Sequence, residues 1–255
     1  MVEVTSRFRT RDRFVSMQPV AGSPAAPVQE LALYLKPTDL MPTDGIVRET
    51  ALKITKGEGT DVQKARALYE WVVESTERNP KTRGCGVGDI KAMLETGTLN
   101  GKCADLNALF VALARASGVP ARDVYGIRVA ASPRGYKSMG RAGDITKAQH
   151  CRAEFYAQGV GWVPVDPADV RKVILEEAPG LTLADDRVKQ ARTMLWGGWE
   201  GNWLAYNTGH DIHLPGSSRA PVPFLMYPQA ENAQGRLDSL DPETFKYRIT
   251  SKEIT

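Results

Sequence analysis

An apolar helical segment followed by a series of strands constrains the fold of this chain more than any other feature. Apolar side chains recur at spacings of three and four between Leu106 and Leu113, which places them on one helix face that must be buried. Segments of strand character come after this helix, at 122–130, 150–157 and 161–167. Because helices and strands do not alternate as in parallel βαβ units, we expect an α+β fold with an antiparallel sheet.

Composition excludes several classes of protein. The chain has 255 residues, of which 42% are apolar and 25% charged, as in ordinary globular proteins with a sizeable core. A net charge of +3 is too small to indicate nucleic acid as a partner, and no apolar run approaches the roughly 20 residues of a membrane span. The first twenty residues lack the apolar stretch of a signal peptide, but a processed exported protein would look the same, so these residues leave localisation unknown.

Three regions of the chain differ in their patterns. Residues 1–43 are predicted to form a β and loop extension, because the alternating arginines from Arg7 to Arg13 favour a strand with a basic solvated face over a nucleic-acid patch. Residues 44–195 are expected to form the core, and 196–255 a β-rich extension packed on that core. Inside the core we expect a mobile polar surface loop at 132–147 and helices within 44–78, at 89–96 and near 183–194.

A cysteine stands at the first turn of the apolar helix. Cys103 follows Asn100-Gly101, which we expect to turn the chain sharply and leave the sulfur uncovered. Unpaired N–H groups and the positive dipole end of a helix N-terminus stabilise a thiolate, which is the nucleophilic form of cysteine. The Cys103 N–H is also placed to hold the oxyanion that forms when its sulfur attacks a carbonyl. These local residues alone support a nucleophile and an ordinary buried cysteine about equally.

A nucleophile of this kind needs a base, and the base needs an acceptor that orients it. His150 opens one predicted strand, and Asp166 closes the next. The two side chains share a face of the hairpin if its connection has an odd number of residues or if the ladder carries a bulge. A five-residue connection, 156–160, would set them directly opposite, and a three-residue connection, 158–160, would set them diagonally. The sequence therefore permits a triad of Cys103, His150 and Asp166.

Two stretches of the chain resemble the transglutaminase-like superfamily of bacterial type. GKCADLNALFVALARASGVPAR, residues 101–122, is similar to the motif with Gly, one residue, the nucleophilic Cys, an apolar helix and then Gly-Val-Pro-Ala-Arg. HCRAEFYAQGVGWVPVDPAD, residues 150–169, is similar to the second half of that pattern, with His at a strand start, Gly-Trp-Val-Pro and Asp-Pro. The order Cys, His, Asp agrees as well, and the resemblance covers about 100–170.

The resemblance implies a papain-like α+β fold, in which the cysteine helix packs on an antiparallel sheet that carries the histidine and the aspartate. Carried over by position, Cys103 is implied to be the nucleophile, His150 the base and Asp166 its orienting group. Bacterial relatives are often exported, which slightly favours a periplasmic or secreted protein. Arg152 stands where Trp is common in the family, and we expect this departure to alter the substrate groove without touching the triad.

Together these patterns predict a thiol enzyme that acts on peptide or glutamine-type amide bonds through an acyl-enzyme. Hydrolysis is slightly favoured over transfer to an amine, because this chain lacks the large accessory domains of animal crosslinking enzymes. The alternative is a transglutaminase-like binding or scaffold module that keeps the fold without turnover. The expected partner is a protein or peptide substrate, and no cofactor is expected.

The remaining cysteines and histidines do not support a second site. Cys151 is expected on the other face of its strand as a core residue, and Cys85 in a Gly-rich loop at the rim of the site. A disulfide between them would need an oxidising compartment. His210 and His213 have a spacing that suits a metal, but no further ligand cluster accompanies them, so no metal site is expected.

Overall fold

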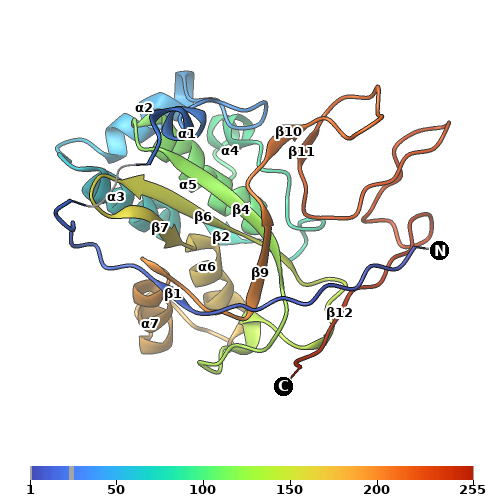
Figure 1. The fold of residues 1–255 in the computed structure, drawn as a ribbon. Coiled ribbons are helices and arrows are strands. Elements are labelled where there is room, and N and C mark those ends of the chain that lie inside the picture. The colour runs from blue at the N-terminus through green and yellow to red at the C-terminus, as the bar shows by residue number, and fades with distance from the viewer. Residues whose placement is uncertain (1, 23–25, 255) are drawn as a thin grey trace.

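The computed structural model describes residues 2–22 and 26–254, and it confirms the α+β class (Figure 1). A four-stranded antiparallel sheet in the order β7-β6-β4-β9 lies at the centre, built from β4 (Ala121–Arg128), β6 (Gln149–Ala157), β7 (Gly161–Val165) and β9 (Trp203–Asn207). The helices are α1 (Val28–Leu33), α2 (Gly45–Ile54), α3 (Asp61–Ser75), α4 (Ile90–Thr96), α5 (Cys103–Ala116), α6 (Pro167–Glu176), α7 (Asp186–Met194) and the short 3-10 helix η1 (Lys137–Met139).

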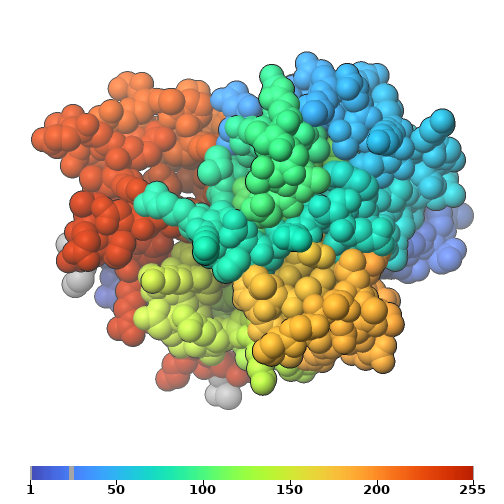
Figure 2. Space-filling model, turned by 180° about the vertical axis from the view of Figure 1, so that it is seen from behind, coloured from blue at the N-terminus to red at the C-terminus, as the bar shows by residue number. Residues whose placement is uncertain are grey.

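The other strands are short and pair in twos. They are β1 (Arg13–Phe14) with β8 (Gly198–Trp199), β2 (Glu77–Arg78) with β3 (Asn100–Gly101), β5 (Gly143–Asp144) with β12 (Thr250–Ser251), and β10 (His210–Ile212) with β11 (Val222–Phe224). Figure 2 shows the side opposite to that of Figure 1, where the helical region in blue to green lies beside the C-terminal segment in orange and red, and a yellow-green segment separates that segment from the α6–α7 region in gold. Among the described residues, no helix has the length and apolar character that crossing a membrane requires.

Helix α5 forms the centre of the core, as its apolar pattern predicted. Every residue from Cys103 to Arg115 is buried, so the helix is covered on all sides and not only along one stripe. It packs on β6 on one side and against α2, α3 and α4 on the others. The helix ends at Ala116 with Ser117 as its C-cap, and Gly118 follows with a left-handed φ of 86°, the conformation that glycine adopts without strain.

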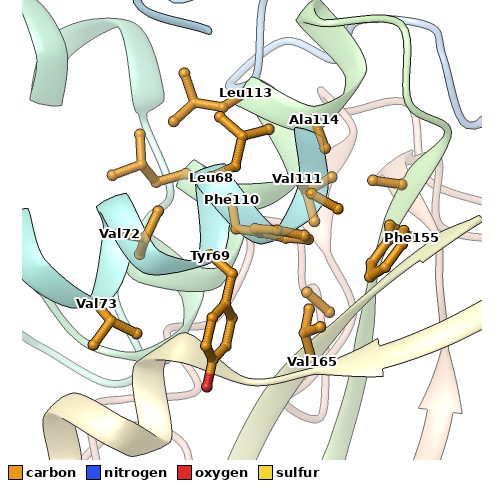
Figure 3. Close-up of a cluster of buried hydrophobic side chains, with 14 of the residues drawn as sticks. Leu68, Tyr69, Val72, Val73, Phe110, Val111, Leu113, Ala114, Phe155 and Val165 are labelled. Carbon is orange, nitrogen blue, oxygen red and sulfur yellow. The ribbon is translucent and has the colours of Figure 1, made fainter. Parts of the chain in front are cut away.

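Side chains from α3, α5 and the sheet meet in one apolar cluster (Figure 3). Leu68 and Val72 of α3 lie against α5, and Phe110 of α5 meets Phe155 of β6 with ring centroids 6.4 Å apart. Helix α3 begins at Asp61, because the Thr60 hydroxyl accepts from the Gln63 N–H and the Gln63 side chain accepts from the Thr60 N–H. This packing fixes α5 on the sheet and so fixes the position of its first residue.

The β6–β7 hairpin uses the shorter of the two predicted connections. Ala157 pairs with Gly161, so residues 158–160 form a three-residue connection. The same register pairs Ala153 with Val165, which places the next residue of the chain diagonally from His150. The structure therefore sets His150 and Asp166 on one face of the hairpin without a bulge between β6 and β7.

The N-terminal segment differs from its prediction. The expected arginine-rich strand is reduced to β1, because its partner β8 offers only two residues for pairing. Arg13 is not part of a solvated face, since its guanidinium pairs with the Glu154 carboxylate and donates to the Trp162 carbonyl at 2.7 Å. Helix α1 then occupies Val28–Leu33, where β or loop was expected.

Two further segments were predicted wrongly in the middle of the chain. The segment 132–147 is not a loose surface loop, because Tyr136, Met139 and Ile145 are buried and β5 pairs with β12. Helix α6 was missed altogether. Its signal is the Asp166-Pro167 step, in which an aspartate caps the helix and proline takes the first helical position.

Candidate active site

Cys103 is the first residue of α5, and a carboxylate of the same helix holds this first turn in place. Asp105 accepts a hydrogen bond from the Lys102 N–H at 2.9 Å, one of the donors that a helix start leaves unpaired. Asn100 and Gly101 do not form the sharp turn that we expected. They lie in β3, which pairs with β2, and the Cys103 side chain is covered, with the residue only 4% exposed.

Asp105 also ties the Gly-rich loop to the helix start. Its Oδ1 accepts from the N–H groups of Val87 at 3.0 Å and Gly88 at 2.9 Å. A Cβ at Gly86, where φ is 97°, or at Gly101 would overlap the Asp105 carboxylate. The glycines therefore let the loop close on Asp105, and this brings the preceding residue, Cys85, next to Cys103.

Replacing Asp105 with alanine is expected to loosen this arrangement. The variant leaves three backbone N–H groups without their partner, so the free energy of unfolding should fall by about 1–3 kcal/mol. Urea unfolding of Asp105→Ala measures the loss, and Asp105→Asn, which keeps one side-chain oxygen as acceptor, serves as the milder control. An unfolding free energy within about 0.5 kcal/mol of wild type would contradict this assignment.

His150 and Asp166 are in direct contact. The distance from Nε2 of His150 to Oδ2 of Asp166 is 2.7 Å, and both residues are buried. His150 is also among the groups that lower the pKa of the Cys103 thiol. Burial and the charge of Arg128 disfavour the protonated ring, but the carboxylates of Asp169 and Asp166 outweigh them and raise the pKa of His150 above its ordinary value. The structure thus brings together the three residues that the sequence singled out.

The Asp166 carboxylate is held by groups that sequence reasoning did not identify. Its Oδ1 accepts from Nδ2 of Asn107 at 3.2 Å and from the Asp169 N–H at 3.1 Å. Asn107 also donates to the Cys151 carbonyl at 2.9 Å, so it links α5 to both strands of the hairpin region. Burial and the charge of Asp169 raise the pKa of Asp166, and His150 and Arg152 oppose this shift without cancelling it. A polar Asn inside an apolar helix was the one sequence signal for this role.

A second carboxylate near His150 is already paired. Asp169 lies 3.5 Å from Nε2 of His150, and its two oxygens accept from Nη2 of Arg128 at 2.6 and 2.7 Å. Burial would raise the pKa of Asp169, but the Arg128 guanidinium outweighs it and holds this pKa well below its usual range. Asp169 therefore stays charged beside the ring and favours imidazolium without competing for the orienting position.

Arg152 borders the triad, contrary to the expectation that it would affect only a substrate groove. It is buried, with its guanidinium carbon 4.7 Å from the ring centre of Trp203 and 5.5 Å from that of Trp199. Its Nε lies 3.6 Å from Oδ2 of Asp166. Burial, followed by the charge of Arg128, lowers the pKa of Arg152 to about 10, so it remains a cation at neutral pH. Trp203 in turn donates to the His150 carbonyl at 2.9 Å.

The three cysteines of the chain gather at the start of α5, and all three are free thiols. Hydrogen bonds from the thiols of Cys151 and Cys85, together with His150, outweigh burial and lower the pKa of Cys103 well below its ordinary value. The contact with Cys103 and burial raise the pKa of Cys85, and burial raises that of Cys151. Cys151 is a core residue as expected, but it also touches the candidate nucleophile. Cys103 is therefore the one of these three thiols whose ionised form is favoured.

The residues around His150 also include types that can bind a metal ion. His150, Asp166 and Asp169 form the one group among the described residues whose ligand atoms lie within 4.8 Å of one another. Arg128 already donates to both Asp169 oxygens, and its charge would repel a cation. The group therefore suits acid-base chemistry better than metal binding. His210, which the sequence raised as a ligand, lies against the buried Asp123 with 3.3 Å between Nε2 and Oδ2.

Comparison with known proteins agrees with this arrangement. A model of the Transglutaminase-like superfamily matches residues 48–167. These residues form a transglutaminase-like domain. The domain contains all three candidate site residues and ends directly after Asp166. The α5 helix on the antiparallel sheet is the papain-like arrangement that the resemblance implied.

Individual relatives extend beyond this chain. An uncharacterized protein of Haemophilus influenzae is 43% identical over 231 residues, which cover 87% of this chain and 62% of that protein. The periplasmic domain of TgpA from Pseudomonas aeruginosa is 18% identical with a TM-score of 0.45, over 67% of this chain and 54% of that one. Red sea bream transglutaminase is 13% identical with a TM-score of 0.32, over 55% of this chain and 26% of that one. This chain thus spans about three fifths of the Haemophilus protein's length.

A pocket of about 410 Å³ opens beside the site, between the transglutaminase-like domain and the C-terminal segment. From the domain, Cys85, Lys102 and Gln149 line it. Lys102 directly precedes Cys103, and Gln149 directly precedes His150, so the pocket wall includes the sequence neighbours of two candidate triad residues. Its opposite wall comes from the irregular stretch between Tyr227 and Tyr247.

Proposed function

We propose that this protein is a thiol enzyme that acts on amide bonds, with Cys103 as nucleophile, His150 as general acid and base, and Asp166 as the group that orients His150. One observation carries the proposal. The buried His150 ring is bound through Nε2 to a buried carboxylate at 2.7 Å, and it helps to lower the pKa of a thiol at the first turn of a helix. A core cysteine needs no such partners, whereas a nucleophile and its base need all of them.

The geometry assigns each proton transfer to a named atom. Because Nε2 of His150 is bound to Asp166, Nδ1 is the nitrogen that exchanges protons on the Cys103 side. The thiolate attacks the amide carbonyl carbon, a C–S bond forms, and the Cys103 N–H stabilises the oxyanion. His150 then protonates the leaving nitrogen as the C–N bond breaks, which leaves a thioester. Water, deprotonated by His150, attacks the thioester and releases the acid and the Cys103 thiol.

Charge near the site favours water over an amine as the acyl acceptor. Lys102, Lys147 and Lys246 line the pocket beside the thiol. A crosslinking enzyme must admit the cationic side chain of a substrate lysine, and three positive charges at the entrance oppose this. We therefore propose hydrolysis, as in a cysteine peptidase or amidase, with transfer to an amine as the less favoured outcome.

A combined cleavage and amine-incorporation screen tests the proposed activity. The wild-type protein is incubated with a peptide library, with and without a small fluorescent amine, and products are identified by mass spectrometry. We expect cleaved peptides in both conditions and little amine incorporation, with Cys103→Ala inactive throughout. If the library is unchanged by the wild-type protein and Cys103 also reacts no faster than Cys85, the alternative of a binding module without turnover is correct.

A further inference from the structure

The pocket beside Cys103 carries an unbalanced positive charge. Four cationic residues line it, and no carboxylate does. Arg83 is already paired with Asp238, at 2.5 Å. Within the described part of the chain, no carboxylate oxygen lies within 4.0 Å of the ammonium groups of the other three, Lys102, Lys147 and Lys246. These lysines are therefore available to an anionic ligand.

The rest of the lining is largely apolar and aromatic. It includes Tyr227, Leu240, Phe245 and Tyr247, all from the C-terminal segment. Aromatic and aliphatic walls suit the side chains and backbone of a peptide, and the lysines around them suit carboxylates. The pocket volume of about 410 Å³ lies within the range of roughly 300–1,000 Å³ typical of ligand sites.

The position of the pocket relates this charge to the reacting atoms. Cys85, which lines the pocket, packs in one buried cluster with Cys103, and its thiol donates to the Gln149 carbonyl at 3.3 Å. Its own thiol has a raised pKa and stays protonated, so it forms part of the wall and does not act as a second nucleophile. A peptide bound in this pocket would therefore lie next to the cysteine cluster that contains Cys103.

Building on the proposed function, we propose that the pocket selects acidic peptide substrates, in which carboxylate side chains next to an apolar or aromatic residue flank the scissile amide. Lys147 and Lys246 are the specificity-determining residues, because both are exposed and line the pocket. Lys102 contributes to the same field but directly precedes the candidate nucleophile, so it is left unchanged in the test.

Binding to an inactive variant tests the pocket without requiring turnover. The probe is a dye-labelled hexapeptide with the sequence Glu-Glu-Phe-Gln-Glu-Glu, and its match has Gln at each Glu position. On the Cys103→Ala background, we expect the acidic peptide to bind at least tenfold more tightly at low salt, as measured by fluorescence anisotropy. The double variant Lys147→Gln, Lys246→Gln should weaken acidic-peptide binding at least fivefold and leave the neutral peptide unchanged.

A matched control separates the pocket from net charge. Lys53→Gln with Lys56→Gln removes the same two charges from exposed positions on and just after α2 and should leave binding as it was. Equal affinity for the two peptides, or no loss in the Lys147 and Lys246 double variant, would overturn the pocket assignment. The rate of Cys103 alkylation in the wild-type protein is a separate readout. A reactive Cys103 thiol together with equal binding of the two peptides refutes only the pocket assignment. An unreactive thiol together with tighter binding of the acidic peptide refutes only the proposed chemistry.

Discussion

Cys103→Ala is expected to abolish all turnover while leaving the protein folded. The thiolate is the only group in the proposed mechanism that forms a bond to the substrate, so its loss removes the acyl-enzyme route entirely. The loss of one sulfur atom at a site on the edge of the core should change the free energy of unfolding by about 1 kcal/mol or less. The rate of product formation on a substrate from the screen and thermal unfolding measure the two effects.

Cys85→Ala and Cys151→Ala are the matched controls for this loss. Each variant removes a thiol that contacts Cys103. In the folded wild-type protein, each of these two thiols has a raised pKa. Both variants should retain measurable turnover, although the pKa of Cys103 should rise toward its ordinary value when either hydrogen bond is lost. Wild-type activity in Cys103→Ala, or a total loss in either control alone, would show that another thiol carries the reaction.

Asp166→Asn is expected to lower kcat by about 10² or more with little change in KM, because the aspartate acts through His150 and not on the bound substrate. The amide keeps the volume and one acceptor but removes the charge that stabilises imidazolium. Its NH2 group would also favour the wrong tautomer of the ring. Steady-state kinetics on a substrate from the screen measure both parameters.

The free energy of unfolding should change little in Asp166→Asn, because the helix cap that this residue forms is kept. Asp166 is fully buried, not peripheral as its place at a strand end suggested, and its side chain caps α6 through the Asp169 N–H. Asparagine caps helices about as well as aspartate, so the helix start is retained. Asp89→Asn is the control, because the Asp89 side chain caps α4 by accepting from the Ala92 N–H and lies outside the candidate triad. An Asp166→Asn variant with wild-type kcat would remove Asp166 from the mechanism.

The strands of the hairpin could be predicted from the sequence, but their register could not. Alternation and the glycines placed β6 and β7 correctly, yet three- and five-residue connections both suited the pattern. The structure uses the three-residue form, with Gly159 and Gly161 at positive φ values of 79° and 92°. That choice depends on how the hairpin packs against α5 and β4, which no local pattern encodes.

The residues that surround the triad could be predicted only in part. Cys103, His150 and Asp166 stand at element ends, where position and residue type together indicate chemistry. Arg128 and Arg152 carry no such signal, because each finds its partner only after the sheet and α6 come together. The alternating arginines at the N-terminus gave a signal for a long strand that the structure does not contain. Alternation forms a strand only where a partner strand exists to pair with it.

The pH dependence of Cys103 alkylation tests the central claim most directly. Iodoacetamide modification is followed by peptide mass spectrometry, which separates Cys103 from Cys85 and Cys151, in the wild-type protein and in His150→Ala. Because the pKa of Cys103 is lowered in the folded state, the thiolate persists as pH falls until that lowered pKa is reached. The wild-type rate should therefore fall by less than tenfold per pH unit below pH 8, whereas a free thiol of pKa ~8.5 loses reactivity about tenfold per unit there. In His150→Ala the rate at pH 6 should drop and its profile should move toward that of a free thiol. If Cys103 follows the free-thiol curve in both proteins, the thiolate–imidazolium pair does not exist.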